Sequence, residues 1–558
     1  MLNQIYKTGL IILCLLITNF VMKAQSFILT NPILAGFYPD PSIVKVGTDY
    51  YLVNSTFSYF PGLSVFHSKD LKNWKQIGNA IDRVSQLDFM ETKMTRGLFA
   101  PDISYHNGTF YITCTEIDRR GNFVITAQNP AGPWSNPVFL PAAKGIDPSL
   151  FFDDDGKGYL IFCGDAPNNK PLHAGHRTLR MYEFDYVNLK IKGEEKILIN
   201  GGADLSKKPF WTEGPHIMKR NGWYYLYAAQ GGTGINHSEV VFRSKTIEGP
   251  YESYENNPIL TQKDLPEDRK NPITSTGHAE LVDGPDGNTY AIFLGTRPYT
   301  GDYYNIGRET FIAPVAWKND WPIINPDSKE IQYHYTANFK EVKQKGTLPQ
   351  SGNFAYKLTF DKGIDLSLLW MRSFDKNAFS TSKEHGLTLK LKPETCMDLG
   401  NPAFLGKRQQ HLFSIAEVSL DFAPKTANEK AGLTIFQNEG HFYFLSKSLG
   451  SIQLYKSNPK SKNMELLAES PINDKIKQVY LRIQSEGDTY SFYFSTNNKN
   501  WEILKEKVDA KFLSTLEAGG YIGCLFGMYA TSSGETSTNT ASFKYLSYKG
   551  NDPVYIKR

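Results

Sequence analysis

The sequence predicts an all-β protein in which a five-bladed β-propeller is followed by a β-sandwich. Three observations support this prediction. Aromatic residues make up 13% of the chain and charged residues 21%, with 45 Gly and 30 Pro, a composition typical of turn-rich β structure. A loosely repeated unit recurs five times in the first 320 residues. Short alternating strands then continue to the end of a chain that, at 558 residues, is too long for one hydrophobic core.

Each repeated unit has the signature of a β-hairpin that opens a propeller blade. A short polar or acidic cluster leads into alternating apolar residues, a Gly-containing turn and an aromatic-rich strand. Further strands follow most copies, which gives about four strands per unit, as a blade requires. Uneven spacing between the copies leaves an ordinary antiparallel sandwich as the alternative. The five copies are PDPSIVKVGTDYYLV from Pro39, PDISYHNGTFYIT from Pro101, IDPSLFFDDDGKGYLIF from Ile146, TEGPHIMKRNGWYYLYA from Thr212 and GHAELVDGPDGNTYAIF from Gly277.

The remaining segments set the predicted domain limits. Residues 326–345 are polar and lack an apolar period, which favours a linker between a propeller at 25–325 and a sandwich at 346–558. The sandwich prediction depends on strand patterns such as LTLKLK at Leu387, AGLTIFQ at Ala431 and TYSFYFS at Thr489.

Residues 1–24 resemble a secretory signal peptide. Lys7 precedes an apolar run from Leu10 to Met22 that is short for a membrane span. A lipoprotein reading at Cys14 is disfavoured by Leu13, where a small residue is expected. We therefore expect a secreted protein, periplasmic or extracellular, with no membrane span after signal removal.

Charge and cysteine usage exclude several classes of function. The net charge of +4, without a long Lys/Arg run, argues against a nucleic-acid partner. The four cysteines beyond the signal have no CxxC spacing, which makes a zinc site improbable. Their apolar flanks predict buried free thiols rather than disulfides. They are Cys114, Cys163, Cys396 and Cys524.

Propeller geometry brings the beginnings of the five copies together. The first strand of every blade lines the central axis, so residues at these positions converge on one funnel. We expect several carboxylates to face this cavity. The converging positions hold Asp40, Asp102, Asp147, Glu213 and His278 with Glu280.

Three of these carboxylates have surroundings that suit acid–base chemistry. Asp40, Asp147 and Glu213 each lie beside Pro or Gly and apolar neighbours, where a charge is costly to bury without a partner. Like charges in one pocket raise at least one pKa and leave another low. Such a division supplies the protonated acid and the ionised base that hydrolysis of a glycosidic bond needs.

These motifs resemble glycoside hydrolase family 43, specifically its β-xylosidase and α-L-arabinofuranosidase members. The resemblance begins with PDPSI, IDPSL and TEGPH and covers nearly the whole chain after the signal. It implies that the second domain is a concanavalin-like jelly roll. Further matching motifs are TFSYFPG at Thr56, GLFAPDISYHNGTFY at Gly97, GGTGINHSE at Gly231, NIGRET at Asn305, NPAFLGKRQQH at Asn401 and KAGLTIFQNE at Lys430.

The resemblance implies a role for each carboxylate. Asp40 looks like the general base that activates water, and Glu213 looks like the general acid. Asp147 is similar to the third carboxylate, which keeps the pKa of the acid raised. The family inverts the anomeric centre, which predicts a separation of roughly 6.5–9.5 Å between the base and the acid.

Further site residues follow from the same resemblance. Arg308 matches a sugar-binding arginine, with a surface salt bridge as the alternative. Phe57 and Phe99 match aromatic positions around the sugar, with core packing as the alternative. His278 matches a histidine that faces a calcium ion or a water cluster on the propeller axis; no cofactor is expected to be required, and a structural calcium there is the possible exception.

The predicted activity is exo-hydrolysis of terminal β-1,4-xylose or α-L-arabinofuranose from xylan or arabinoxylan oligosaccharides. An α-L-arabinofuranosidase as the main activity, or a non-catalytic carbohydrate-binding propeller, remain alternatives. A retaining, fructan-cleaving enzyme is disfavoured because NDPNG and an RDP triplet are missing. The chain carries Gln230 where relatives often have Glu, at the expected rim of the pocket. A loop from Gly523 of the second domain is expected to reach the site, and the oligomeric state is left open.

Overall fold

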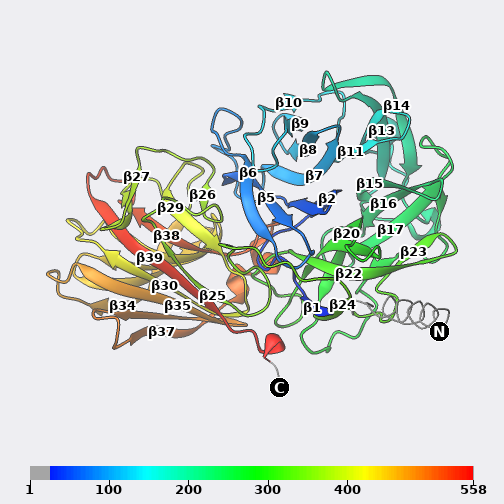
Figure 1. The fold of residues 1–558 in the computed structure, drawn as a ribbon. Helices are drawn as coiled ribbons and strands as arrows, with labels where there is room; N and C mark the ends of the chain where they lie inside the picture. Colours follow the sequence, from blue (N-terminus) through cyan, green and yellow to red (C-terminus); the bar gives the residue numbers. More distant parts are fainter. Residues whose placement is uncertain (1–25, 557–558) are drawn as a thin grey trace, which may run out of the picture.

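The computed structural model describes residues 26–556, so the predicted signal segment lies outside the described residues. Two all-β bodies lie side by side, a propeller coloured blue to green and a sandwich coloured yellow to red (Figure 1). Half of the chain is strand and about 3% is helix. The predicted fold class, a five-bladed propeller followed by a β-sandwich, is confirmed.

Five antiparallel sheets form the propeller, and each blade is built from consecutive strands. The first strands of neighbouring blades contact one another in the order β2, β7, β11, β15, β20 and back to β2, which closes the ring. The blades are β2 (Ser42–Val46), β3 (Asp49–Val53), β5 (Gly62–Ser68) and β6 (Lys75–Ile81); β7 (Leu98–His106), β8 (Thr109–Glu116), β9 (Gly121–Ala127) and β10 (Val138–Phe139); β11 (Ile146–Phe152), β12 (Gly158–Asp165), β13 (Arg177–Asp185) and β14 (Lys190–Asn200); β15 (Glu213–Arg220), β16 (Trp223–Gln230), β17 (Ser238–Ser244), β18 (Glu252–Ser253) and β19 (Leu260–Thr261); and β20 (Thr274–Asp283), β21 (Thr289–Thr296), β22 (Glu309–Lys318) and β23 (Trp321–Ile324).

The inner hairpins form where the sequence places turn residues. Asn107–Gly108 and Asn221–Gly222 connect the first two strands of the second and fourth blades, and all four residues have positive φ. Two consecutive positive φ values are what a type I′ hairpin requires, and Asn–Gly provides them at little cost. The aromatic strands that follow the turns therefore pair with the first strands in a fixed register.

Two eight-stranded sheets form the sandwich, with their apolar faces in one core cluster. Within residues 26–556, helix is confined to short pieces: η1 (Pro167–Asn169), η2 (Leu205–Lys207), η3 (Lys511–Leu513), α2 (Thr515–Ala518) and η4 (Pro553–Tyr555). One sheet contains β25 (Ala355–Thr359), β27 (Phe379–Ser382), β28 (Gly386–Lys390), β30 (Phe413–Asp421), β35 (Gln478–Glu486), β36 (Thr489–Ser495), β37 (Glu502–Asp509) and β39 (Thr540–Gly550); the other contains β4 (Tyr59–Phe60), β26 (Leu369–Met371), β29 (Ala403–Arg408), β31 (Lys430–Asn438), β32 (His441–Ser448), β33 (Ser451–Asn458), β34 (Asn463–Pro471) and β38 (Leu525–Thr531).

The propeller and the sandwich are joined by a strand pairing as well as by side-chain packing. Strand β4 comes from the propeller sequence but pairs with β26 of the sandwich. Beside this pairing, the Phe60 and Phe374 rings stack with their centroids 5.7 Å apart. The predicted linker contains β24 (His334–Ala337), which pairs with β1 (Phe27–Thr30) at the start of the described chain. The division at residues 325 and 346 stays a prediction.

A buried ion-pair network also joins the bodies. The guanidinium of Arg297 donates to Glu309 at 2.6 and 2.9 Å and to Asp552, near the C-terminus, at 2.7 Å. Arg297 and Glu309 are fully buried. Because a buried charge is stable only when it is paired, this network fixes the end of the chain against the propeller.

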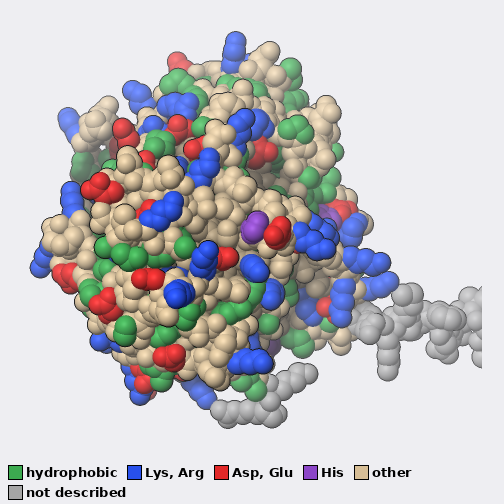
Figure 2. Space-filling view, turned by 90° about the vertical axis from the view of Figure 1, so that its left-hand side faces the viewer, with side chains coloured by type: hydrophobic (Ala, Val, Ile, Leu, Met, Phe, Trp, Pro, Cys, Tyr) green, Lys and Arg blue, Asp and Glu red, His purple; other side chains and the backbone are tan. Residues whose placement is uncertain are grey.

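The structure also bears on the predictions about cysteines, membrane-spanning helices and surface charge. The four cysteines of the described chain are free and buried, as predicted. No helix within residues 26–556 is long and apolar enough to cross a membrane. On the face shown in Figure 2, basic and acidic side chains are interspersed rather than gathered by sign.

Candidate active site

A cavity of about 640 Å³ lies at the axial end of the blades where the first strands begin. All seven predicted site residues line it: Asp40, Phe57, Phe99, Asp147, Glu213, His278 and Arg308. They come from segments that are up to 268 residues apart in the sequence. The convergence expected from propeller geometry is therefore what the structure shows.

Irregular backbone aims the axial residues into this cavity. Asp40, Ala100, Asp147 and His278 all have positive φ, and Gly214 takes the equivalent conformation beside Glu213. The first strands of blades two to five have register shifts at these points. A bulge redirects side chains at the end of a strand, and positive φ in non-glycine residues is strained backbone of the kind found at functional sites.

The Asp40 carboxylate is held by a cation and a hydroxyl. Arg308 Nη1 donates to Oδ1 at 2.7 Å, and Ser55 Oγ donates to Oδ2 at 2.6 Å. Burial alone would raise the pKa of Asp40, but Arg308, then His278 and Ser55, outweigh it and the pKa is lowered. Asp40 is therefore ionised at neutral pH, as a general base must be.

Glu213 has the opposite electrostatic surroundings. Burial raises the pKa of its carboxyl well above the usual value, and the negative charges of Asp147 and Asp40 raise it further. Burial and the negative charge of Asp40 also raise the pKa of Asp147, although Asp147 Oδ2 accepts a hydrogen bond from Gly214 N at 3.0 Å. One cavity thus contains an ionised and a protonated carboxyl, which is the pair that acid–base hydrolysis uses.

Aromatic rings form one wall of the cavity. The Phe57 and Phe99 ring centroids are 5.5 Å apart and nearly perpendicular. Phe57 also packs in a core cluster with Phe37 and Tyr59, so both interpretations of this residue hold: it is core, and it lines the site. Phe99 is only partly buried.

The sandwich completes this wall with Tyr521, which sequence reasoning missed. Its ring is stacked at 11° to Phe57, and its backbone N–H donates to Thr95 Oγ1 at 2.7 Å. The loop predicted from Gly523 begins two residues too late, because Leu525 already starts strand β38 and Gly523 packs against the backbone of Ile306.

Other missed residues line another part of the same cavity. Phe210 and Trp211 precede Glu213, and the Arg177 guanidinium lies 3.9 Å from the centre of a Trp211 ring. Arg177 also forms an ion pair with Asp165. The only sequence signal for this part of the cavity is the aromatic pair itself, since Arg177 is 34 positions away from Trp211 and belongs to another blade.

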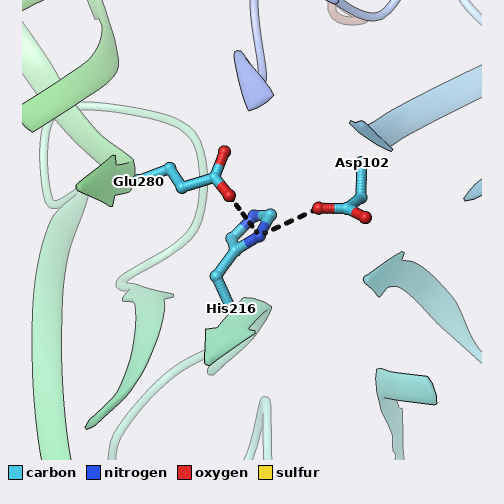
Figure 3. Close-up of side chains that lie close together, drawn as sticks. All are labelled: Asp102, His216 and Glu280. Carbon is cyan, nitrogen blue, oxygen red and sulfur yellow. Dashed lines mark ion pairs between the residues drawn. The ribbon is translucent and has the colours of Figure 1, made fainter. Parts of the chain in front are cut away.

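Asp102 and Glu280, which were expected to face the same cavity, do not line it. Ala100 takes the cavity position in the second blade, and Asp102, two residues further along β7, lies one layer deeper. There His216 Nδ1 lies 3.5 Å from Asp102 and 3.6 Å from Glu280, between the two carboxylates (Figure 3). The prediction was wrong for these two residues because each lies two positions further along its strand than the residue that lines the cavity, and the bulges shift its depth.

This deeper cluster is the candidate for a cation on the axis. Among the described residues, Asp102, His216 and Glu280 each offer one potential metal-ligand atom, and these three atoms lie within 4.8 Å of one another. His278, the predicted metal ligand, is not part of this group. Calcium takes six to eight oxygen ligands, whereas this group offers two carboxylates and one imidazole. Burial lowers the pKa of His216, but Glu280 and Asp102 outweigh it and raise it to about 9. The protonated ring thus already supplies positive charge between these carboxylates.

Comparison with known proteins agrees with this geometry. The family description "Glycosyl hydrolases family 43" matches residues 29–322, and "Beta xylosidase C-terminal Concanavalin A-like domain" matches residues 357–549. A structure titled as a GH43_12 protein from a capybara gut metagenome has a TM-score of 0.83 at 40% identity, covering 90% of this chain and 95% of that one.

Two relatives match over nearly the full length of both chains. A xylosidase/arabinosidase of Butyrivibrio fibrisolvens is 38% identical over 93% of this chain and 99% of its own length. A non-reducing end alpha-L-arabinofuranosidase of Bacteroides ovatus is 34% identical over 98% of this chain and 99% of its own length. With its propeller and its sandwich both matched, the chain belongs to glycosyl hydrolase family 43 and is a glycoside hydrolase.

Proposed function

We propose that the chain is an inverting, exo-acting hydrolase that releases terminal β-1,4-xylose, or α-L-arabinofuranose, from xylan or arabinoxylan oligosaccharides. One observation carries this proposal: Asp40 is held ionised by Arg308, while Glu213 is held protonated, in the same cavity. The relatives named as xylosidases and arabinosidases support the choice of sugars.

The proposed reaction uses each carboxyl once. Asp40 accepts a proton from water, and the water oxygen forms a bond to the anomeric carbon as the glycosidic C–O bond breaks. Glu213 donates its proton to the leaving oxygen, so the products are the free sugar with inverted configuration and the shortened chain. Burial and the charge of Asp147 raise the pKa of Glu213, which keeps the acid protonated until that step.

Product analysis tests this proposal. Arabinoxylan oligosaccharides are incubated with the protein, and the first anomer released is identified by NMR. Inversion supports Asp40 as a base acting on water, whereas retention would make it a nucleophile. Release of arabinose with little xylose would favour the α-L-arabinofuranosidase alternative.

The non-catalytic alternative needs a separate control. Glu213→Gln keeps the size of the side chain but cannot donate a proton as the acid does, so turnover of xylobiose, whose sugar leaving group needs that proton, should fall about 10²- to 10⁴-fold. Turnover of a nitrophenyl xyloside should fall less, because nitrophenolate leaves without being protonated. Binding without turnover in both the unaltered protein and this variant would instead favour a carbohydrate-binding propeller.

No cation is required in this proposal, because Asp40, Glu213 and the solvent supply every proton movement. We further propose that protonated His216, rather than calcium, balances the carboxylates of the axial cluster. Activity should then survive dialysis against a chelator. We also propose that residues 1–24 direct secretion, and that the partners are carbohydrates rather than nucleic acids.

A further inference from the structure

A second cavity of about 630 Å³ lies beside the active-site cavity on the fourth blade. Strands β16, β17 and β18 and the loop around residues 203–210 form its walls. It is nearly as large as the active-site cavity and falls within the range of about 300–1,000 Å³ that is typical of ligand sites. We call it the blade-four cavity.

Phe210 lines both cavities. Its side chain is 48% exposed, although the surrounding backbone fixes its position. A Cβ on Gly175 would meet the Phe210 ring at 2.2 Å, so the ring lies directly against that glycine, and Gly231 N donates to the Phe210 carbonyl at 2.7 Å. An exposed but fixed aromatic face between two cavities is a surface on which a sugar ring can pack.

The lining of the blade-four cavity suits neutral sugars. Six amide or hydroxyl side chains contribute to its polar part, among them Gln230, Asn236, Ser253 and Tyr254. Lysines and acidic residues both contribute, and Lys207 is paired with Asp204 at 3.4 Å. A few placed polar groups beside aromatic faces are typical of sites for uncharged polar ligands, whereas an anionic ligand would favour basic residues alone.

Gln230 connects the blade-four cavity with the acid. Its Oε1 accepts hydrogen bonds from Ala203 N at 3.2 Å and from Thr212 Oγ1 at 3.4 Å. Thr212 directly precedes Glu213 in the sequence. Gln230 therefore lines the blade-four cavity and also contacts the residue next to the catalytic acid.

We propose that the blade-four cavity binds the sugar residues of the leaving chain beyond the first one, so that an oligosaccharide passes from the active-site cavity across Phe210. This proposal rests on the proposed function, because it assigns the terminal sugar to the active-site cavity. It names the ligand as a neutral oligosaccharide of the xylan type.

Chain-length dependence tests the proposal. The kcat/KM of the unaltered protein is measured on a nitrophenyl glycoside and on xylobiose to xylopentaose, or on the arabinofuranosyl-substituted series if arabinose is the sugar released. We expect kcat/KM to rise several-fold between the disaccharide and the tetrasaccharide. A flat series from xylobiose onward would overturn the proposal.

A variant that fills the blade-four cavity tests whether the chain-length dependence of kcat/KM arises there. Ser253 is exposed on the short strand β18, so Ser253→Arg should fill the cavity without disturbing the core, and Ser253→Ala is its matched control. In Ser253→Arg, kcat/KM should no longer rise from the disaccharide to the tetrasaccharide, while kcat/KM on the nitrophenyl glycoside should stay unchanged. If a folded Ser253→Arg protein retains the full chain-length advantage, the oligosaccharide lies elsewhere and the proposal fails.

A binding measurement separates this proposal from the proposed function. Xylotetraose and xylobiose are titrated calorimetrically into Glu213→Gln and into Glu213→Gln combined with Ser253→Arg. Tighter binding of the longer chain, lost in the double variant, would support the cavity assignment even if no glycoside were cleaved. Equal affinities for both chains in Glu213→Gln would overturn the assignment, whatever the activity of the unaltered protein.

Discussion

Arg308 Nη1 lies 2.7 Å from Asp40 Oδ1, and both side chains are buried at the axis of the propeller. The pair joins the segment before the first blade to the segment before the third strand of the last blade. The Arg308–Asp40 ion pair therefore connects the last blade to the first. The same ion pair keeps the base, Asp40, ionised. The pH dependence of activity follows from this pair and from the raised pKa of Glu213.

Replacing Arg308 should move the acidic limb of the pH profile. Asp40 is active when ionised, so activity is lost as pH falls through its pKa, which Arg308 lowers. In Arg308→Met that pKa should rise by about one to three pH units, and the acidic limb of kcat/KM should shift upward equally. Arg308→Lys, which keeps the charge, should shift less; an unmoved limb in the methionine variant would exclude Asp40 as the group that titrates there.

Replacing Asp147 should move the alkaline limb. Glu213 is active when protonated, so activity is lost as pH rises through its pKa, which the charge of Asp147 helps to raise. Asp147→Asn removes that charge and still offers an oxygen to Gly214 N. The alkaline limb of kcat/KM should therefore move to lower pH, while the acidic limb moves little. An alkaline limb that stays in place would show that Asp147 does not control the acid.

The axial residues were predictable because propeller geometry turns repeated sequence positions into spatial neighbours. Asp40, Asp147 and Glu213 each open a copy of the repeat, so the repeat alone places them together. Depth along the axis was not predictable. Asp102 and Glu280 lie below the cavity because local bulges decide the layer that each side chain enters, and bulges have no clear signal in a single sequence.

Residues from outside the repeat were not predictable in the same way. Tyr521 reaches the site through contact with Thr95, 426 positions away, and no periodicity connects these positions. The rim formed by Arg177 and Trp211 likewise depends on how two blades are placed. Contacts between loops of different blades or domains depend on tertiary packing. A local sequence pattern therefore does not predict them.

The contribution of the sandwich to the site can be measured at Tyr521. Tyr521→Ala removes a ring that packs against Phe57 and Phe99, so the sugar loses part of its aromatic wall. We expect KM to rise about 2- to 10-fold, since an aromatic contact contributes about 0.5–1.5 kcal/mol. Tyr521→Phe keeps the ring and should keep KM; an alanine variant with unchanged KM would show that the ring does not contact the substrate.

The buried network around Arg297 should make the two domains unfold together. Arg297→Met leaves Glu309 and Asp552 without their shared cation, and breaking a buried ion pair costs about 3–5 kcal/mol. The free energy of unfolding in urea should fall by this amount, and tryptophan fluorescence and circular dichroism should report one shared transition. Arg482→Met is the matched control, because its pair with Glu417 is partly exposed and should cost less than about 1 kcal/mol. Equal losses in the two variants would contradict a structural role for the network, and two separate transitions in the unaltered protein would show that the sandwich and the propeller are stable independently.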